Sequence, residues 1–383
     1  MEQWTEIRAA DFIEFNPRMS IKKGTIATKV AMDKLQPFTK KIPDSEKASF
    51  SGGSKFRNGD TIMARITPCL ENGKTAFVDI LGKAEVAFGS TEFIVMRARE
   101  GISDPQFIYY LATSPWFRNI AIKSMVGSSG RQRVQQSVLD DLVLNVPPLE
   151  EQKKISSFLC VLDQKIALNN EINDNLQQQA KSLYEEMFLN DPDADMVSGT
   201  LSDIATITMG QSPSGSSYNE ESVGEVFYQG RAEFGFRFPT RRLFTTEPKR
   251  MAEPGDVLLS VRAPVGDLNV AYEKCCIGRG LGAIHSKTGD SSFMLYTMFA
   301  LKPQLDVFNG EGTVFGSINR DGLSNLPVNI PSPEEIAKFE AVVRPMDNLI
   351  RTNYEEICRL QSIRDSLLPK LMSGEIDVSA VQL

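Results

Sequence analysis

The amino-acid sequence predicts an α+β protein with a pseudo-two-fold internal repeat, in which two similar α/β globular domains are separated by two long helices that form a coiled coil. Two segments, 147–188 and 332–374, carry apolar residues at heptad spacing. Each follows a segment that mixes short apolar strands with a helix. We therefore divide the 383 residues into a first globular domain (1–147), a central spacer helix (148–190), a second globular domain (191–331) and a distal spacer helix with a C-terminal tail (332–383).

The first long helix is predicted from a seam of apolar residues. Steps of four and three residues from Ile155 reach positions that are apolar except for two asparagines. Pro148 suits the first turn, where its missing N–H has no helical partner. A helix of about 33 residues is about 50 Å long, and it cannot bury this stripe alone. The seam positions are Ile155, Leu159, Leu162, Ile166, Asn169, Asn173, Leu176, Ala180, Leu183 and Met187.

The partner helix is predicted in the same chain, at an offset of 184 residues. The corresponding positions are apolar or repeat the asparagine, except Arg364, whose place we expect Ile363 to take. Ser332 and Glu335 have the spacing of a capping box, and Gly374 can end the helix in a left-handed conformation. This second seam comprises Phe339, Val343, Met346, Ile350, Asn353, Ile357, Leu360, Arg364, Leu367 and Leu371.

Two features of the seams depart from a plain apolar stripe. Asn169 recurs as Asn353, and a polar residue in an apolar seam can fix register and partner at a cost in stability. Pro345 interrupts the second helix, where we expect it to break or kink the helix one turn below Met346.

Motifs recur between the two globular segments. A turn followed by an apolar strand occurs at 58–62 and at 254–258, and each strand is followed by a proline, Pro68 or Pro264. Arg65 and Arg262 lie near these prolines, but one step out of register with each other. Leu-x-x-Leu segments at 139–142 and 323–326 precede the prolines that open the long helices.

Apolar runs place the other elements. Strands are expected at 61–66, 76–80, 92–96, 226–229, 257–261 and 268–271, and helices at 105–121, with a break near Pro115, and at 291–301. Residues 190–195 are expected to form a linker, because they lack the glycine and closing glutamate of a calcium loop. Five residues of 105–121 are expected in the core rather than in a base-stacking platform: Phe107, Tyr110, Leu111, Trp116 and Phe117.

Composition excludes several classes of protein. No apolar run approaches the roughly 18 residues of a membrane span, and the N-terminus lacks a signal-peptide pattern. No membrane partner is therefore expected. The five cysteines are scattered, which favours a reducing, cytoplasmic setting. His285 is the single histidine, so a histidine metal site or triad is not expected, and we expect this residue in a loop or at a strand end.

Charge is unevenly distributed along the chain. Residues 1–147 carry 20 Lys and Arg against 16 Asp and Glu, a net charge of +4, whereas the whole chain has a net charge of −7. A mildly basic first domain permits contact with nucleic acid, but the acidic remainder argues against coating nucleic acid by bulk charge.

Motifs for catalysis are absent from the sequence. No phosphate-cradling GxxxxGK[ST], GxSxG or Cys/His arrangement occurs, and the glycine-rich stretch 278–282 has the wrong spacing for a dinucleotide fingerprint. We expect a tight turn beside a ligand or backbone at 278–282. The sequence therefore predicts no catalytic residue, no metal site and no cofactor on this chain.

Polar loops rich in Arg, Lys, Ser, Gln and Gly remain as candidates for contact with DNA, and we call them the candidate reading loops. Such side chains donate to phosphates, and Arg or Gln can read guanine or adenine in the major groove. For each loop alone, a merely solvated surface is an equal alternative. The candidate DNA-binding residues are Lys22, Lys23, Thr25, Arg65, Ser129, Arg131, Gln132, Arg133, Gln211, Ser212, Ser214, Tyr218, Gln229, Arg231, Arg241, Arg242, Arg262 and Arg279.

Taken together, these motifs resemble the DNA-specificity subunit of type I restriction-modification systems, over essentially the whole chain. The marks are the doubled helix entries at 147–152 and 331–335, the run Leu-Met-Ser-Gly-Glu-Ile at 371–376, and Gln-Ser-Pro-Ser-Gly at 211–215 followed by Arg-Ala-Pro-Val-Gly at 262–266.

The resemblance implies two target-recognition domains held apart by an antiparallel helix pair, each reading one part of a bipartite, asymmetric site in double-stranded DNA. The helices would set the unread spacer and dock two methyltransferase subunits, which restriction subunits join for host defence. S-adenosylmethionine and ATP with magnesium would then belong to the partners. The alternative hypothesis is a coiled-coil scaffold whose globular domains bind proteins and not DNA. A third hypothesis, a free-standing enzyme, is disfavoured by the missing motifs.

Overall fold

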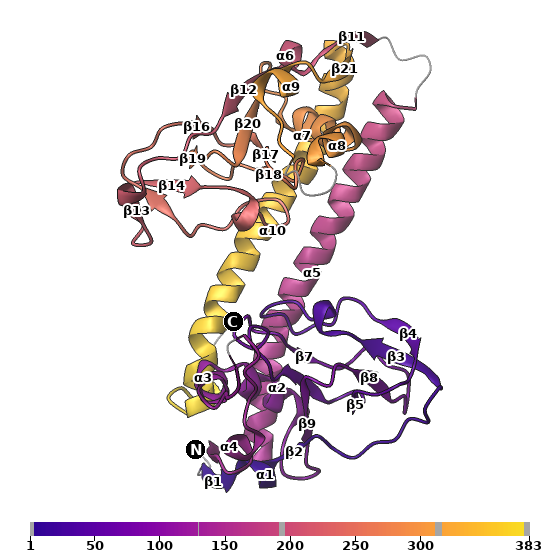
Figure 1. The fold of residues 1–383 in the computed structure, drawn as a ribbon, viewed down its shortest axis with the longest axis vertical. Helices are drawn as coiled ribbons and strands as arrows, with labels where there is room; N and C mark the ends of the chain where they lie inside the picture. Colours follow the sequence, from indigo (N-terminus) through magenta and orange to yellow (C-terminus); the bar gives the residue numbers. More distant parts are fainter. Residues whose placement is uncertain (1–3, 129, 191–195, 311–315, 379–383) are drawn as a thin grey trace. The chain divides into compact units, whose positions relative to one another are not determined.

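Two units of related topology make up the protein in the computed structural model, which describes residues 4–128, 130–190, 196–310 and 316–378. The first unit comprises the chain up to Asn169 together with the residues from Glu355 onward, and the second unit spans Asn170–Tyr354. Each unit therefore contains part of both long helices, α5 (Leu149–Phe188) and α10 (Pro333–Ser373) (Figure 1).

The first unit contains two four-stranded sheets and a two-stranded ribbon. The inner sheet, β2-β9-β6-β7, is antiparallel throughout, with Thr61 opposite both Phe77 and Met96. The outer sheet is β4-β3-β8-β5, in which β3 and β8 run parallel, and the ribbon pairs β1 with β10. The strands are β1 (Thr5–Arg8), β2 (Ile13–Phe15), β3 (Ile26–Val30), β4 (Glu46–Ser49), β5 (Ser54–Phe56), β6 (Thr61–Ala64), β7 (Thr75–Phe77), β8 (Ala87–Gly89), β9 (Phe93–Ala98) and β10 (Val143–Val146).

Helices cover one face of the inner sheet of the first unit. The expected break at Pro115 is confirmed: α2 (Pro105–Thr113) ends at Ser114, whose hydroxyl accepts from Phe117 N at 3.3 Å and begins α3 (Pro115–Lys123). Phe107, Tyr110, Leu111 and Phe117 are buried in the core, whereas Trp116 is 49 % exposed. The shorter helices are α1 (Ala9–Phe12), the 3-10 turn η1 (Met32–Lys34) and α4 (Gln136–Asp140).

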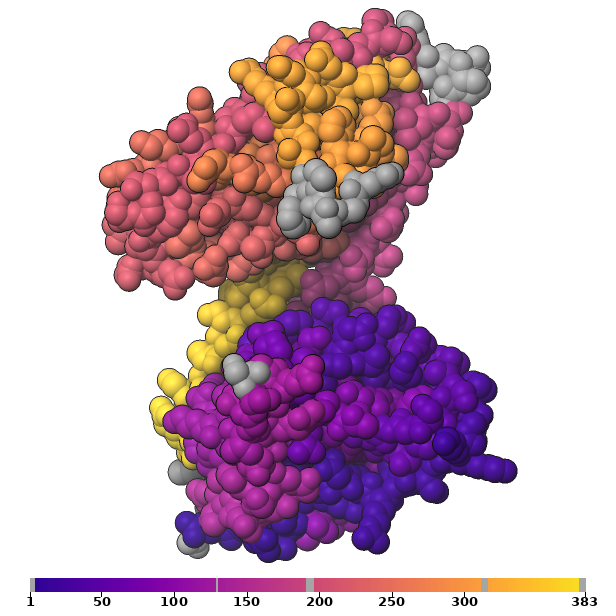
Figure 2. Space-filling model, in the orientation of Figure 1, coloured from indigo at the N-terminus to yellow at the C-terminus, as the bar shows by residue number. Residues whose placement is uncertain are grey.

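The second unit repeats this plan. Its inner sheet, β12-β20-β17-β18, is antiparallel, with Val257 opposite both Val270 and Ile284. The outer sheet, β13-β15-β14-β19-β16, forms a lobe at one side of the unit, pink to salmon in Figure 2, and β11 pairs with β21. The strands are β11 (Met196–Thr200), β12 (Ala205–Met209), β13 (Tyr218–Asn219), β14 (Glu225–Tyr228), β15 (Phe244–Thr245), β16 (Met251–Ala252), β17 (Val257–Ser260), β18 (Leu268–Val270), β19 (Cys275–Ile277), β20 (Leu281–Ser286) and β21 (Pro327–Pro331).

The helices of the second unit occupy the same places in the order of elements. The predicted helix at 291–301 is observed as α7 (Ser291–Ala300), and all but three of its ten residues are buried. The remaining helical segments are α6 (Leu201–Ile204), η2 (Gly215–Ser217), η3 (Arg231–Glu233), α8 (Lys302–Asp306), η4 (Val307–Asn309) and α9 (Arg320–Ser324).

A buried aspartate marks the internal repeat. Asp60 precedes β6 and pairs with Arg97 of β9 at 2.7 Å, and Asp256 precedes β17 and pairs with His285 of β20 at 2.6 Å. Each aspartate also accepts the backbone N–H of the residue three before it, Arg57 or Glu253, both at 2.8 Å. The same turn therefore opens the central strand of each inner sheet, as the recurring motifs predict.

The two long helices pack antiparallel within each unit. In the first unit, Leu162 and Ile166 form an apolar cluster with Ile357 and Leu360, while Asp163 pairs with Arg364 at 2.9 Å. Ile363 packs against this cluster, as expected for the place left by Arg364. None of the helices among the described residues is long and apolar enough to cross a membrane.

In the second unit the helix seam is aromatic at one end and polar at the other. Phe339 lies against Tyr184 and Phe188, with ring centroids 5.7 and 5.5 Å apart. Asn353 donates to Asn173 Oδ1 at 2.8 Å, so a predicted seam asparagine does bond across the helix pair. Exposure along both seams does not exceed 9 % at Ile155, Leu159, Leu162, Ile166, Asn169, Val343, Ile350, Asn353, Ile357 and Leu360, and it is partial at Leu176, Leu183 and Leu367.

The break expected at Pro345 is wrong, because α10 is one continuous helix from Pro333 to Ser373. Pro345 is exposed, whereas Val343 and Ile350 on either side of it are fully buried. Packing on both sides of the proline therefore outweighs the lost hydrogen bond and the steric clash, which together cost about 3 kcal/mol.

Candidate nucleic-acid interface

In the first unit, the Arg131 loop (residues 127–133) lies beside the segment that follows β6. Val126 and Arg133 exchange backbone hydrogen bonds at 3.0 and 2.9 Å and close the loop. Thr67 N donates to Gln132 O at 3.0 Å, and Val134 N donates to Arg65 O at 2.8 Å. The structure thus brings Arg65 together with Arg131, Gln132 and Arg133, whereas Ser129 lies outside the described residues.

Glu92 holds one arginine of this loop. Arg133 forms a forked pair with Glu92, with Nη2 and Oε1 2.7 Å apart. The hydrogen bonds from Arg133 lower the pKa of Glu92, and the same contact raises the pKa of Arg133. Arg131 is exposed, and Gln132 is half-buried. The backbone carbonyl of Gln132 accepts from Thr67 N, which leaves its side-chain amide out of this contact. Arg131 is therefore the guanidinium of the loop that no carboxylate pairs with among the described residues.

Lys22, Lys23 and Thr25 form a separate turn at the start of the outer sheet. Thr25 N donates to Lys22 O at 3.0 Å, and Phe50 exchanges backbone hydrogen bonds with Gly24 and Thr25 at 2.9 and 2.8 Å. Gly24 has φ of +85°, a left-handed conformation that favours glycine. All three predicted side chains are exposed, and among the described residues no hydrogen bond or ion pair joins them to the Arg131 loop.

Three loops of the second unit converge on one another. Gln211 N donates to Ile277 O at 2.9 Å, Gly280 N donates to Gln229 O at 3.2 Å, and Arg279 N donates to Ser212 Oγ at 3.3 Å. A Cβ at Gly210 would lie 2.1 Å from Gly278 O, so glycine is required for this approach. The stretch 278–282 is the tight turn beside backbone that its glycines predict.

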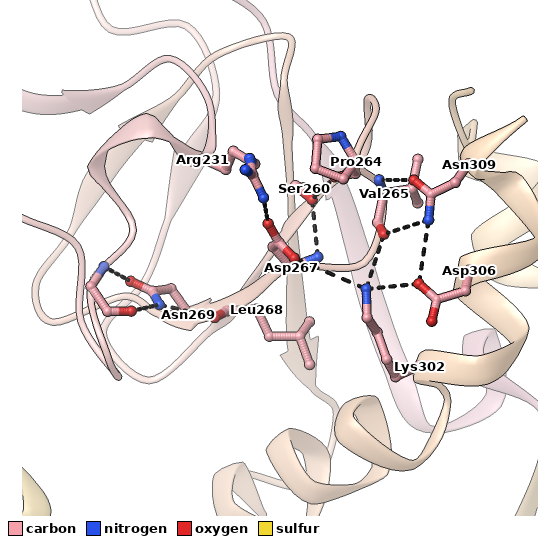
Figure 3. A network of polar contacts seen from close by, with 11 residues as sticks. Arg231, Ser260, Pro264, Val265, Asp267, Leu268, Asn269, Lys302, Asp306 and Asn309 are labelled. Carbon is pink, nitrogen blue, oxygen red and sulfur yellow. Dashed lines mark hydrogen bonds and ion pairs between the residues drawn. The ribbon is translucent and has the colours of Figure 1, made fainter. Parts of the chain in front are cut away.

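A polar network fixes the Arg231 side chain (Figure 3). Arg231 pairs with Asp267, and Asp267 lies 4.0 Å from the ammonium of Lys302. Lys302 also pairs with Asp306 at 2.8 Å and donates to Val265 O at 3.2 Å, so the turn at 264–267 is bound to α8. Lys181, Arg231 and Lys302 together line an open cleft of about 510 Å³, and neither lysine was singled out by its sequence.

The remaining predicted residues of the 210–218 and 240–242 loops make contacts within the protein. Arg242 pairs with the buried Glu233 at 2.7 Å and with Glu220 at 3.4 Å. Arg241 pairs with Glu273. Tyr218 packs on Phe227 with ring centroids 4.9 Å apart and donates to Pro213 O at 3.1 Å, and Ser214 shares a hydrogen bond with Ser216 at 2.8 Å.

Arg65 and Arg262 are not equivalent in the two units. Backbone pairing puts Ile66 opposite Arg133 and Arg262 opposite Ser317. Arg262 therefore takes the place of Ile66, one residue beyond Arg65, which agrees with the register difference in the sequence. Arg262 is exposed, whereas Arg65 is half-buried and donates weakly to Val134 O at 3.5 Å.

One candidate reading position was missed in the second unit. Gly316 accepts from Ala263 N at 3.0 Å, as Gln132 accepts from Thr67 N, so Gly316 and Ser317 occupy the places of Gln132 and Arg133. The offset of 184 residues found in the helices maps Arg133 onto Ser317 and could have revealed this. The two units thus present different side chains at the same site.

Comparison with known proteins gives a consistent answer. The family described as the type I restriction modification DNA specificity domain matches residues 1–178 and again 194–359. A putative type I restriction enzyme MjaX specificity subunit from Methanocaldococcus jannaschii is 30 % identical over 338 residues, which cover 84 % of this chain and 79 % of that protein. The EcoAI specificity subunit from Escherichia coli is 36 % identical over 104 residues, covering 27 % and 18 % of the two chains.

A solved structure extends the likeness to the fold. The crystal structure of a type I restriction-modification system S subunit from M. genitalium aligns with a TM-score of 0.60 at 16 % identity, covering 97 % of this chain and 96 % of that one. Two matched domains, two units of repeated topology and a relative aligned along most of its length agree, and the chain belongs to the family of type I restriction-modification DNA-specificity subunits.

Proposed function

We propose that each unit reads one half of a bipartite, asymmetric DNA site, and that the helix pair sets the number of unread base pairs between the halves. The observation that supports this most directly is the repeat itself: two units share inner-sheet topology but carry different loop side chains. Similar readers with unlike contact residues would recognise two different half-sites.

In the first unit, Arg131 and Gln132 are the proposed base-reading residues, because bidentate arginine and amide contacts identify guanine and adenine in the major groove. Arg133 would contact a base only after its guanidinium releases Glu92. Lys22, Lys23 and Thr25 suit phosphate contacts, since their turn exposes two ammonium groups and a hydroxyl.

In the second unit, the cluster of Gln211, Ser212, Gln229 and Arg279 is the proposed reading surface. Its loops are held together by backbone contacts, so the side chains are presented from a fixed frame. Arg262 extends this surface. Lys302, in the neighbouring cleft, suits a phosphate contact because an ammonium acts as a point charge.

We assign catalysis to partner subunits. Two methyltransferase subunits, which would bring S-adenosylmethionine, are proposed to dock on the long helices, and restriction subunits using ATP and magnesium would complete the nuclease. Exposed apolar residues on the helices support docking: Val161 and Leu168 on α5 are 49 and 51 % exposed, and Val342 and Leu349 on α10 are 49 and 45 % exposed.

The test is DNA binding by the full-length chain purified with its methyltransferase subunits. Bound duplexes selected from a random library should contain two half-sites at one separation, and affinity should fall steeply with added salt. A protein-binding scaffold, the alternative suggested by the acidic second half of the sequence, would enrich no motif. Mapping of methylated adenines in the host genome should return the same two half-sites.

A further inference from the structure

A polar contact that the reading loops do not use recurs in both units. In the first unit, Lys40 Nζ donates to Tyr110 Oη at 3.0 Å, and Tyr110 donates to Asp163 Oδ2 at 2.6 Å. We call Lys40, Tyr110 and Asp163 the first latch. It joins the connection between β3 and β4 to helix α2 and to the long helix α5.

The second unit contains the corresponding group. Arg237 donates to Asp347 Oδ1 at 2.7 Å and to Tyr296 Oη at 3.2 Å, and Tyr296 donates to Asp347 Oδ1 at 3.1 Å. We call Arg237, Tyr296 and Asp347 the second latch. It joins the connection between β14 and β15 to α7 and to the long helix α10.

Position in the fold establishes that the latches are equivalent. Tyr110 and Tyr296 are each the sixth residue of their helix, and Asp163 and Asp347 are each the fifteenth residue of α5 and α10. The carbonyl oxygen of the latch cation accepts from the inner-sheet strand in both units: Phe77 N donates to Lys40 at 3.0 Å, and Val270 N donates to Arg237 at 2.8 Å.

Burial indicates that these contacts are specific. Arg237 is 4 % exposed and Tyr296 is 1 % exposed, and a buried guanidinium is strongly unfavourable unless it is paired. Gln177 of α5 accepts a third hydrogen bond from Arg237 at 3.1 Å, so the second latch holds both long helices. Nε of Arg237 is buried and has no hydrogen-bond partner among the described residues.

The first latch also contacts both long helices, but its cation is a lysine packed on aromatic rings. Lys40 Nζ lies over the rings of Tyr110, Tyr109 and Phe77, 4.6 to 5.6 Å from their centroids. Asp163 also accepts from Arg364 of α10 at 2.9 Å. Burial, and then the neighbouring carboxylate, raise the pKa of Tyr110, so its hydroxyl remains a donor. Here too, both long helices are engaged.

The latches share chain segments with the candidate reading residues. In the first unit, the turn at 22–25 leads into β3 and from there to Lys40, and in the second unit the loop at 229–231 leads to Arg237 through η3. A shift of the latch against its helix would therefore displace the loop attached to it.

We propose that Lys40 and Arg237 are positioning residues, which fix each reading surface against the long helices and so confine the DNA target to a single gap between its half-sites. The inference rests on the proposed function of the helix pair as the spacer. It assigns a specificity role to two cations that need not touch DNA.

Selection from a random duplex library tests this inference, using the full-length chain with its methyltransferase subunits. Wild type should yield two half-sites at one separation. Arg237→Met should keep the bases of both half-sites but admit neighbouring separations, so that the ratio of Kd between altered and native gaps falls toward one. Lys40→Met should do the same, and Arg237→Lys, which restores the cation found in the first latch, should narrow the distribution again.

Two controls keep the outcome decisive. Lys274→Met removes an exposed cation that pairs with Glu253 at 3.4 Å in the same unit, and it should leave the gap unchanged. Tyr296→Phe removes only one hydroxyl, so it remains informative if Arg237→Met does not fold, and it should broaden the gap to a smaller extent. Folded latch variants that retain the single native gap would overturn the inference. A wild-type protein that enriches no bipartite motif would instead overturn the proposed function.

Discussion

At the residue scale, carboxylates already hold several of the candidate reading arginines. Arg133, Arg231 and Arg242 pair with Glu92, Asp267 and Glu233 respectively. When such an arginine contacts a base, the base replaces its carboxylate partner, so the contact adds little to the affinity for DNA. It contributes more to the discrimination between bases. This arrangement separates the accessible Arg131 from its neighbour Arg133.

Replacement of Arg131 tests that distinction. Arg131→Ala should weaken binding by about 1–3 kcal/mol and relax one position of one half-site, because a bidentate base contact is lost. Fluorescence anisotropy with duplexes varied at each position measures both effects. Arg8→Ala, which removes an exposed arginine paired with Asp141 in the same unit, is the matched control and should leave binding unchanged. An equal loss of affinity for every duplex, whichever base is varied, would show that Arg131 contacts only the DNA backbone.

Glu85 gives a prediction for pH. Lys47 at 2.8 Å, Thr28 at 2.5 Å and the N–H of Gly82 at 2.9 Å lower the pKa of Glu85 from 4.5 to about 2. A lowered carboxyl pKa stabilises the folded state fully above the unfolded value near 4.5, and this contribution is lost as pH falls toward 2. Glu85→Gln should therefore lower Tm near neutral pH, with the difference from wild type shrinking below pH 4.5. A constant difference across that range would contradict the assignment.

At the element scale, the sequence predicts best where a repeating pattern outweighs local preference. The long helices follow from heptads at Ile155, Leu159 and their successors. Continuous apolar runs predict the inner-sheet strands β6, β7, β9, β17 and β18, but not β2, β12 or β20. In the outer sheets, the strand expected at 226–229 is observed as β14, but β5 and β8 escape detection because they are three residues long and show no alternation of polar and apolar side chains.

The latches escaped detection for a different reason. Tyr110 and Tyr296 are 186 residues apart, Asp163 and Asp347 are 184 apart, and Lys40 and Arg237 are 197 apart. Insertions between the elements hide the match, and the cation differs between the units. The structure reveals that Lys40 and Arg237 correspond, because both donate to the equivalent tyrosine and both accept a backbone hydrogen bond from the inner sheet. The predicted loops do not reveal which of their side chains converge, because that depends on glycines such as Gly210 and Gly280 at close backbone approaches.

Pro345 provides a test of packing against local preference. Pro345→Ala should stabilise the second unit, because it restores a donor to the helix and removes a clash, together worth up to about 3 kcal/mol. Hydrogen exchange at amides of 341–350 measures the change locally, and protection should rise there more than elsewhere. Unchanged protection would mean that the helix already relaxes around the proline at no cost.

At the scale of the whole molecule, the proposed spacer function predicts that longer helices increase the gap between the half-sites by a whole number of base pairs. Insertion of seven residues in both helices, after Asn169 and after Tyr354, preserves the seam because it adds one heptad. The helices lengthen by about 10.5 Å, which corresponds to about three base pairs of duplex. Methylation mapping should therefore return the native half-sites with a gap about three base pairs longer. Altered half-site bases at an unchanged gap would contradict the spacer function.

The first unit is assembled from both ends of the chain, and this affects the order of folding during synthesis. Leu368 and Leu371, near the end of α10, are buried in the same core as Phe12 and Met96. At roughly 5–20 residues per second, the ribosome needs about 10–40 s to advance from Asn169 to these leucines. The contiguous second unit can close as soon as Tyr354 emerges, while the amino-terminal half still waits for its last helix. The part of the polypeptide translated first is therefore the last to be completed.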